Sequence, residues 1–216
     1  HSGQISTHEV FDKISELESW SPESINPKMV GRREGWWGSS ENFESFMDEL
    51  ITWRELGYHT CVRRANYNQY SSLPEWAIKT LHEHSSDERE HIYSLDELTY
   101  SQTHDEIWNA AQNQLRTQGV IQNYLRMLWG KKILEWTPNP QIALSYMITL
   151  NDRYSLDGRD PNSYSGVFWI LGRYDRAWGP ERSIFGKIRY MTSDSTARKF
   201  NLKPYLEKWG NESLGV

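Results

Sequence analysis

The chain has 216 residues, of which 37% are hydrophobic, and its eleven Trp and twelve Tyr supply large apolar side chains, so it is long enough for one hydrophobic core. No apolar run reaches the length of a membrane span, and the net charge of −5 does not predict a surface that binds nucleic acid. The single cysteine, Cys61, excludes an internal disulfide and fits a reducing intracellular compartment, either the cytoplasm or the nucleus.

Helix-forming residues dominate and alternating apolar runs are absent, so the sequence predicts one all-α domain over residues 1–216. The first helix is expected to open at Ser6-Thr7 and to end before Trp20. Residues 19–40 are rich in Pro, Gly and Ser and predict a long ordered loop. Three further helices are expected before residue 103: one that follows Asn42 and runs through Leu56, one after residues 71–74, and a short one capped by Ser94.

The stretch over residues 103–137 predicts two amphipathic helices folded back on each other. Thr103 or Asp105 can cap the first helix with a side-chain oxygen, and Gly119 suits the left-handed residue that ends it. Apolar residues then continue the helical period through Trp136. We expect the rest of the fold to form around this helical hairpin.

Three tryptophans of the hairpin are spaced so that they can meet. Trp108 lies eleven residues before Gly119 and Trp129 lies ten residues after it, so antiparallel packing brings the two side by side. Trp136 follows Trp129 by seven residues, almost two turns, and therefore shares its helix face. Three neighbouring indoles could relay an electron between a buried cofactor and the surface, although spacing alone favours simple core packing.

Beyond the hairpin, a helix is expected from Asn139-Pro140 through Leu150, followed by a loop over residues 152–163 and a short helix near Trp169. A last helix is expected after Asn201, which can cap it. The loop is rich in Asp and Asn, but its spacing fails the calcium-binding template, and the histidines before residue 92 lie on a charged segment. The sequence therefore predicts no metal site.

Four runs of the sequence match the pattern of a known family: WNAAQ, LRMLWGKKILEWT, LNDRYSLDGRDPN and FGKIRYM. In these runs the chain resembles the photoactive domain of the class II DNA photolyases, flavin enzymes that use light to split cyclobutane pyrimidine dimers. A looser similarity extends from the opening HSGQIS to the KW that ends at Trp209. The resemblance implies an all-α, FAD-binding catalytic domain of photolyase/cryptochrome type, with damaged DNA as its partner. It also implies an electron relay through Trp129, Trp108 and Trp136.

The resemblance assigns three residues to FAD. Arg126 of LRM and Asp157 of LDGRD would pair across the isoalloxazine ring, and Asn151 of LND would lie beside flavin N5. An arginine favours an anionic flavin, and a carboxylate orients the arginine through a charge-assisted fork. A purely structural ion pair between Arg126 and Asp157 is the alternative interpretation.

Five residues match positions that contact the lesion or the duplex in that family: Glu49, Trp53, Met127, Trp169 and Arg176. Two tryptophan faces can stack on a flipped-out pyrimidine pair, and the Glu49 carboxyl group can hydrogen-bond to its carbonyl edge. Arg176 matches the arginine that fills the hole left in the duplex. From its apolar helix stripe alone, Trp53 would instead be assigned to the core.

We expect these groups to surround one deep cavity. Arg126 and Asp157 should line it, Asn151 should border it, and the lesion-binding side chains should converge on its mouth. Lys131 and Lys132 are expected to flank that mouth together with the duplex-binding arginine, so that DNA binding weakens as the salt concentration rises.

The sequence departs from the family pattern at four places. The amino-terminal α/β antenna domain and the serine-rich segment that follows it have no counterpart here, so the resemblance implies that the antenna domain is separate or missing. The other three departures are Val120-Ile121-Gln122 after the hairpin glycine, the GYHT run at residues 57–60, and Arg173-Tyr174 in a segment one residue shorter than usual. A cryptochrome-like flavin photoreceptor or redox module without repair activity is therefore the alternative function.

Overall fold

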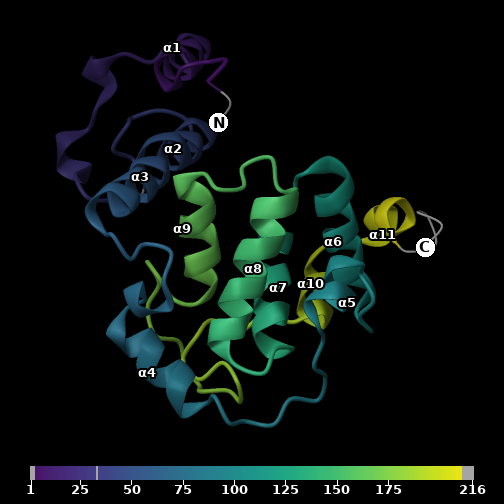
Figure 1. The fold of residues 1–216 in the computed structure, drawn as a ribbon. Helices are drawn as coiled ribbons and strands as arrows, with labels where there is room; N and C mark the ends of the chain where they lie inside the picture. The colour runs from purple at the N-terminus through teal and green to yellow at the C-terminus, as the bar shows by residue number, and fades with distance from the viewer. Residues whose placement is uncertain (1–2, 33, 211–216) are drawn as a thin grey trace. The chain divides into compact units, whose positions relative to one another are not determined.

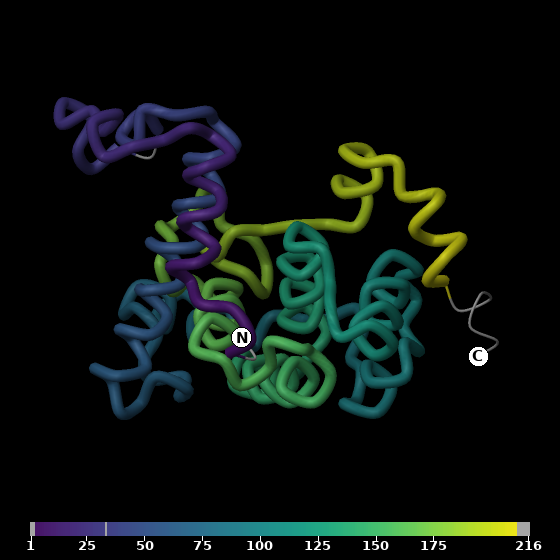
Figure 2. Tube along the Cα trace, turned by 90° about the horizontal axis from the view of Figure 1, so that it is seen from above, coloured from purple at the N-terminus to yellow at the C-terminus, as the bar shows by residue number. Residues whose placement is uncertain are grey.

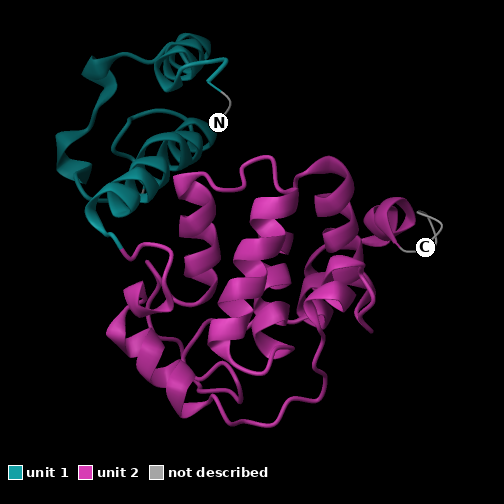
Figure 3. Ribbon diagram, viewed as in Figure 1, with its two compact units in different colours: residues 1–65 teal, residues 66–216 magenta. Residues whose placement is uncertain are grey.

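The computed structural model describes residues 3–32 and 34–210. In that part of the chain the regular elements are helices and no strand is present, which confirms the predicted all-α fold. The chain divides into two compact units, residues 1–65 and residues 66–216 (Figure 3). The single domain over residues 1–216 stays a prediction. Its two ends, residues 1–2 of the HSGQIS run and residues 211–216, lie outside the described residues.

The first unit holds helices on both sides of the predicted loop. Ser6 caps the first helix, as expected, whereas the next helix begins two residues earlier than expected. The reason is Ser40, whose side chain accepts a hydrogen bond from the Phe43 N–H and forms the cap. The elements in chain order are α1 (Thr7–Leu17), two 3₁₀ turns (Pro22–Ser24 and Pro27–Met29), α2 (Glu41–Met47), a π-helical segment (Asp48–Trp53) and α3 (Arg54–Arg63).

A buried carboxylate orders the loop of this unit. Glu44 is 5% exposed and accepts hydrogen bonds from the backbone N–H groups of Gly35 and Gly38. Gly38 has a φ of 65°, and a Cβ at this position would lie 2.0 Å from the Ser24 carbonyl oxygen. The turn therefore requires glycine, and the expected long loop is tied to α2 through the side chain of Glu44.

Five aromatic rings form the apolar part of the first unit: Phe11, Trp20, Trp36, Trp37 and Phe43. The Trp20 and Trp37 rings pack edge to face with centroids 5.4 Å apart. The Trp20 indole N–H also donates a hydrogen bond to the Trp37 carbonyl oxygen at 2.7 Å. Ring contacts between a helix and a loop thus take the place of helix-to-helix packing here.

The second unit builds its core on the helical hairpin. Asp105 caps α6, and Gly119 ends it in the left-handed region with a φ of 74°, as the sequence predicts. The hairpin packs against α8, α9 and α11, the last of which contacts α6 (Figure 1). The helices of this unit are α4 (Glu75–Glu83), α5 (Leu95–Thr99), α6 (Glu106–Gln118), α7 (Asn123–Glu135), α8 (Pro140–Tyr154), α9 (Pro161–Ile170), α10 (Ser193–Lys199) and α11 (Lys203–Trp209), with a 3₁₀ turn at Tyr70–Ser72.

The later boundaries differ from the sequence predictions. Because α8 runs to Tyr154 and α9 begins at Pro161, the connecting loop covers residues 155–160 rather than 152–163. Asp160 caps α9 by accepting a hydrogen bond from the Asn162 N–H, and proline fits the first helical position. The chain then runs from α9 to α10 without another named helix (Figure 2). The sequence does not predict α10, because its polar run SDSTARK lacks apolar periodicity.

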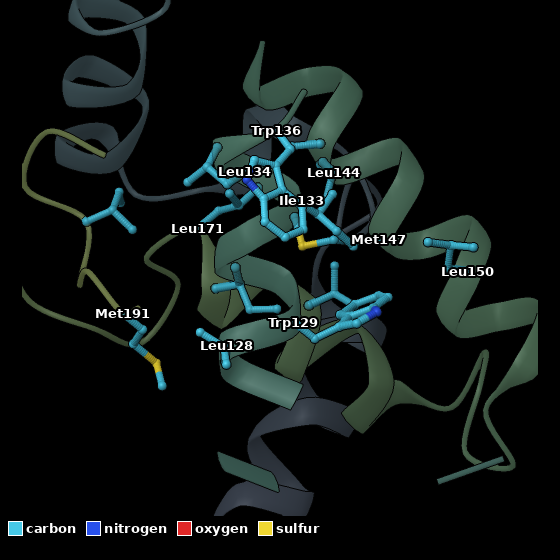
Figure 4. Packing of buried hydrophobic residues seen from close by; sticks show 14 of the residues in the cluster. Leu128, Trp129, Ile133, Leu134, Trp136, Leu144, Met147, Leu150, Leu171 and Met191 are labelled. Atoms are coloured by element: carbon cyan, nitrogen blue, oxygen red, sulfur yellow. The ribbon is translucent and has the colours of Figure 1, made fainter. Parts of the chain in front are cut away.

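Side chains of α7 and α8 fill the centre of this core. Trp129 and Ile133 of α7 lie near Met147 of α8 (Figure 4). On another side α7 closely approaches α9, because a Cβ added at Gly130 would lie 2.0 Å from Ile170 Cδ1. At this point α7 and α9 therefore pack with no room for a side chain larger than that of glycine.

Candidate functional site

The three tryptophans of the hairpin meet inside the second unit. Trp108, Trp129 and Trp136 are 0%, 1% and 2% exposed. The Trp108 indole N–H donates a hydrogen bond to the Trp129 carbonyl oxygen at 3.0 Å, and the Trp108 and Trp136 rings pack edge to face with centroids 5.6 Å apart. Trp108 thus contacts both of the others, which confirms the predicted placement. Their role as an electron relay stays a prediction.

Gln112 fixes the orientation of the Trp129 indole. Its Oε1 accepts a hydrogen bond from the Trp129 Nε1–H at 2.8 Å, and its Nε2 donates to the Thr99 carbonyl oxygen at 3.4 Å. The Gln112 side chain is fully buried, so losing it would leave a buried indole N–H without a partner. Sequence reasoning missed Gln112, although a polar residue one turn after Trp108 on an apolar helix face is a usable signal.

Tyr93 and His104 surround Trp136 at the outer end of this group. Their rings pack edge to face on Trp136 with centroids 5.5 and 5.2 Å away, and Lys132 Nζ lies 5.3 Å from its ring centre. The Tyr93 hydroxyl oxygen is 2.7 Å from His104 Nδ1 and accepts a hydrogen bond from the His104 backbone N–H at 3.1 Å. Burial and the neighbouring His91 lower the pKa of His104, so its imidazole is neutral at neutral pH.

Arg126 on α7 and Asp157 on the loop after α8 form the predicted ion pair. Arg126 Nη1 lies 2.9 Å from Asp157 Oδ2, and Nη2 lies 3.4 Å from Oδ1. Partial burial opposes ionisation of Asp157, but hydrogen bonds from Arg126 and Ser155 outweigh it, so the pKa of Asp157 is lowered. The carboxylate is therefore charged at neutral pH and holds the guanidinium in a fixed orientation.

Asn151 is buried near the end of α8, where its Nδ2 donates a hydrogen bond to Ser163 Oγ on α9. The loop that carries the ion pair folds back onto this turn, because a Cβ added at Gly158 would lie 2.7 Å from the Asn151 carbonyl oxygen. The three residues assigned to FAD are thus carried by α7, α8 and the loop that joins α8 to α9, and these helices pack against one another. The cavity that they are expected to line stays a prediction.

The five residues assigned to the lesion are divided between the two units. The first unit carries Glu49 and Trp53, and the second carries Met127, Trp169 and Arg176. Glu49 and Trp53 lie on the π-helical segment, where the Trp53 indole N–H donates to a carboxylate of the same segment at 2.8 Å. π-helical turns are frequent at functional sites, and apolar periodicity does not predict them. The convergence of the five side chains stays a prediction.

The shortened segment after Trp169 is held by a buried arginine. Arg173 donates a hydrogen bond to the Tyr67 carbonyl oxygen at 2.7 Å, and its guanidinium carbon lies 3.8 Å from the ring centre of Phe168. The next residue, Tyr174, has a φ of 63°, which L-residues with large side chains rarely adopt. Its ring packs on Trp169 with centroids 6.2 Å apart. The departure from the family pattern thus shapes the surroundings of Trp169.

Arg176 lies on the exposed part of the same segment. Its guanidinium carbon is 4.0 Å from the ring centre of Trp178, and that of Arg189 is 5.1 Å from the same ring. The Trp178 indole N–H donates to Asp175 Oδ1 at 3.0 Å, which fixes the ring. An exposed cationic side chain supported by an aromatic ring is suited to contact a nucleic acid.

The expectation that Lys131 and Lys132 flank an open site is wrong. Lys131 is fully buried and its Nζ donates a hydrogen bond to the Ile170 carbonyl oxygen. Desolvation outweighs the favourable charge of Asp175 and lowers the pKa of Lys131 to about 7. Lys132 is largely buried and pairs with Glu135 at 2.7 Å. The physical reason is that α7 packs against α6, α8 and α9, so that Lys131 lies in the core and Lys132 lies beside Glu135.

Within residues 3–32 and 34–210, no three His, Cys, Asp or Glu side chains come together in a way that could hold a metal ion. None of the helices described in those ranges is long and apolar enough to cross a membrane.

Comparison with known proteins finds similarity to deoxyribodipyrimidine photo-lyases. The chain is 49% identical over 163 residues to a deoxyribodipyrimidine photo-lyase of Methanothermobacter thermautotrophicus, 41% identical over 207 residues to one of Arabidopsis thaliana, and 40% identical over 209 residues to one of Potorous tridactylus. These matches cover 76%, 95% and 96% of this chain, but only 36%, 38% and 36% of the three relatives. No protein-family model matches the chain. An all-α region with these similarities supports the photolyase family.

Proposed function

We propose that this chain is the helical, FAD-binding catalytic part of a class II DNA photolyase, a lyase that repairs cyclobutane pyrimidine dimers in DNA with light. The observation that carries the proposal is the contact of Trp108 with both Trp129 and Trp136. Three buried indoles in contact can pass an electron between the surface and the interior. The names of the three relatives support the same reaction.

The Arg126–Asp157 pair supports FAD as the cofactor. The pair engages both Nη atoms of the guanidinium, and an arginine has five N–H donors, so further donors remain for an electron-rich ring. Asn151 supplies a buried amide for flavin N5. Reduced FAD, when bound, would supply the electron that splits the dimer.

The side chains of this protein have three tasks in the proposed reaction. Trp53 and Trp169 stack on the flipped-out dimer, and Met127 packs beside it. Glu49 hydrogen-bonds to the carbonyl edge of the dimer, and Arg176 enters the gap in the duplex. The indoles carry an electron inward from Trp136 to Trp108 and then to Trp129, with Trp108 in contact with both of the others. A DNA substrate and a single cysteine fit the cytoplasm or the nucleus.

The proposal is tested with the purified chain. We would add FAD, remove the unbound cofactor, record the absorption spectrum, reduce the flavin and illuminate it with a dimer-containing oligonucleotide. Recovery of thymine absorbance is expected, together with its loss in Trp169→Ala while the flavin bands persist. Trp36→Ala, which removes another half-buried tryptophan, is the matched control and should repair normally.

Two results would contradict the proposal. A protein without flavin bands would reject the cofactor assignment. A protein that holds reduced FAD but repairs no dimer would favour the alternative, a cryptochrome-like photoreceptor or redox module without repair activity.

A further inference from the structure

A pocket of about 560 Å³ lies beside the outer tryptophan of the hairpin. Its walls come from the segment before α5, the segment before α6, the end of α7 and residues 181–190, all within the second unit. Trp136 and His104 line it together. Trp136 is 2% exposed and belongs to the lining, so a molecule in the pocket would lie beside this indole. A volume of this size suits a small ligand.

The charge of the pocket favours some ligands over others. Its lining carries four carboxylates, Glu88, Glu90, Glu135 and Glu181, against two cations, Lys132 and Arg182. Lys132 is engaged by Glu135 at 2.7 Å, and Lys187, outside the lining, is 3.1 Å from Glu181. The segment that contributes Glu88 and Glu90 is itself acidic, with the run DERE at residues 87–90. A negative potential at the mouth attracts cations and repels anions.

We propose that this pocket binds the small electron donor that refills the tryptophan relay, and that it selects cationic or neutral donors over anionic ones. The proposal rests on the proposed function, because an electron vacancy arises on Trp136 only if the relay delivers electrons inward to a light-excited flavin. The structure places the donor site at the outermost indole, with the aromatic rings of Tyr93 and His104 beside it.

With a thiol as donor, the step balances as follows. One electron passes from the thiol sulfur to the oxidised indole of Trp136, which returns to its neutral form. The S–H bond breaks, and the proton leaves to water in the pocket. Two thiyl radicals then form one S–S bond. In total, two thiols become one disulfide, two electrons pass inward along the relay, and two protons are released to water. The flavin of the proposed function is the oxidant.

Three thiols of similar size but different charge test the selection: cysteamine, 2-mercaptoethanol and 2-mercaptoethanesulfonate. With FAD bound, we expect light-driven flavin reduction by the cationic thiol to exceed that by the anionic thiol about fivefold at low salt, and high salt should reduce the ratio. The three thiols also differ in acidity, so the ratio of the cationic to the anionic rate is compared between the parent protein and its variants. The double variant Glu88→Gln, Glu90→Gln should lower it about threefold. The double variant Asp194→Asn, Glu207→Gln, an equal charge change on α10 and α11 outside the pocket lining, should leave it unchanged.

A second measurement needs neither FAD nor light. The chain is titrated with the thioethers 2-(methylthio)ethylamine and 2-(methylthio)ethanesulfonate, which have the same two charges and no S–H bond. The imidazole proton resonances of His91 and His104 should shift and saturate with the amine and move much less with the sulfonate. His8, in the first unit, is the internal control, and the resonances are assigned with His91→Gln and His104→Gln.

The two measurements separate this proposal from the proposed function. Failure of every thiol to reduce the flavin would count against the relay, while the imidazole titration still decides whether the pocket prefers a cation. Normal photoreduction with the same charge ratio in the double variant would overturn the pocket proposal and leave the relay intact. Equal imidazole shifts with amine and sulfonate would also overturn it.

Discussion

Both compact units surround tryptophans with other side chains, but they hold these rings in different ways. In the first unit, Trp20 and Trp37 are half-buried and pack ring to ring, partly on a loop. In the second unit, Trp108 and Trp129 are buried between helices, and hydrogen bonds from their indole N–H groups fix them. The Trp20 indole N–H bonds to the backbone of Trp37 beside α2, whereas the indole N–H groups of Trp108 and Trp129 bond to groups on packed helices. The second arrangement suits the proposed electron relay, because helix packing keeps its rings at short, fixed separations.

In each unit a buried charged group joins a helix to another segment, Glu44 in the first and Lys131 in the second. Glu44 accepts hydrogen bonds from two backbone N–H groups, which suit the carboxylate charge. Lys131 donates to a carbonyl oxygen in a fully buried position, and burial disfavours its charged form. The carboxylate therefore stabilises a loop, whereas the lysine makes the stability of the core depend on pH.

The largest expected effect is on flavin photoreduction, which should depend on the tryptophans of the second unit and not on those of the first. Trp129→Phe conserves most of the side-chain volume but removes an easily oxidised ring, so we expect flavin photoreduction by an external donor to fall about 100-fold or more, with FAD binding nearly unchanged. Trp37→Phe in the first unit is the matched control and should leave the rate as it is. Undiminished photoreduction in Trp129→Phe would mean that both sets of tryptophans only pack.

The next largest effect concerns the buried lysine. The pKa of Lys131 is about 7 in the folded protein and about 10.4 in the unfolded chain, so the unfolded state binds more protons between these values and stability rises with pH. Chemical denaturation measures the unfolding free energy of the parent and of Lys131→Met at pH 10 and at pH 7. Between these two pH values the parent should lose about 3 kcal/mol of stability relative to the variant. The exposed Lys79→Met is the control. The same pH trend in both variants would refute the assignment.

A smaller effect is expected for the buried carboxylate of the first unit. Glu44→Gln weakens the charge-assisted hydrogen bonds to Gly35 and Gly38, which we expect to cost about 2 kcal/mol. Hydrogen exchange of these two amides should accelerate about 30-fold, while amides of α7 in the second unit keep their rates. Glu41→Gln, an exposed change on the same helix, is the control. Equal exchange in both variants would show that Glu44 does not order the loop.

The smallest effect concerns the ion pair assigned to the flavin. Asp157→Asn should cost about 1 kcal/mol at neutral pH, because its partner is partly solvated. The folded pKa of Asp157 is lowered, so this stabilisation is present above about pH 4 and is lost as the pH falls through the folded value. Acid titration of unfolding measures it, with the exposed Asp12→Asn as control. If FAD binding is unaffected by Asp157→Asn, the pair is structural only, which was the alternative interpretation.

The sequence by itself determined the helical hairpin and the meeting of its tryptophans, because the signals involved are local. Asp105 can cap a helix, Gly119 can end one, and the spacing of Trp108 and Trp129 from that glycine fixes which turns lie opposite. The resemblance added the Arg126–Asp157 pair, which no local pattern predicts. The predicted bounds of the loop after α8 differ from the structure by a few residues. The polar residues of this run predict a longer loop, whereas Asp160 caps α9 and starts the helix within the run.

Only the tertiary structure decided which side chains are buried and which neighbours they meet. Lys131 has the sequence context of an exposed cation, yet α7 is packed against α6, α8 and α9, so its ammonium group lies in the core. The pocket beside Trp136 combines segments more than ninety residues apart, from Glu88 to Tyr190. A helix pattern specifies which residues share a face, but long-range packing specifies what covers that face, and no sequence period carries this information.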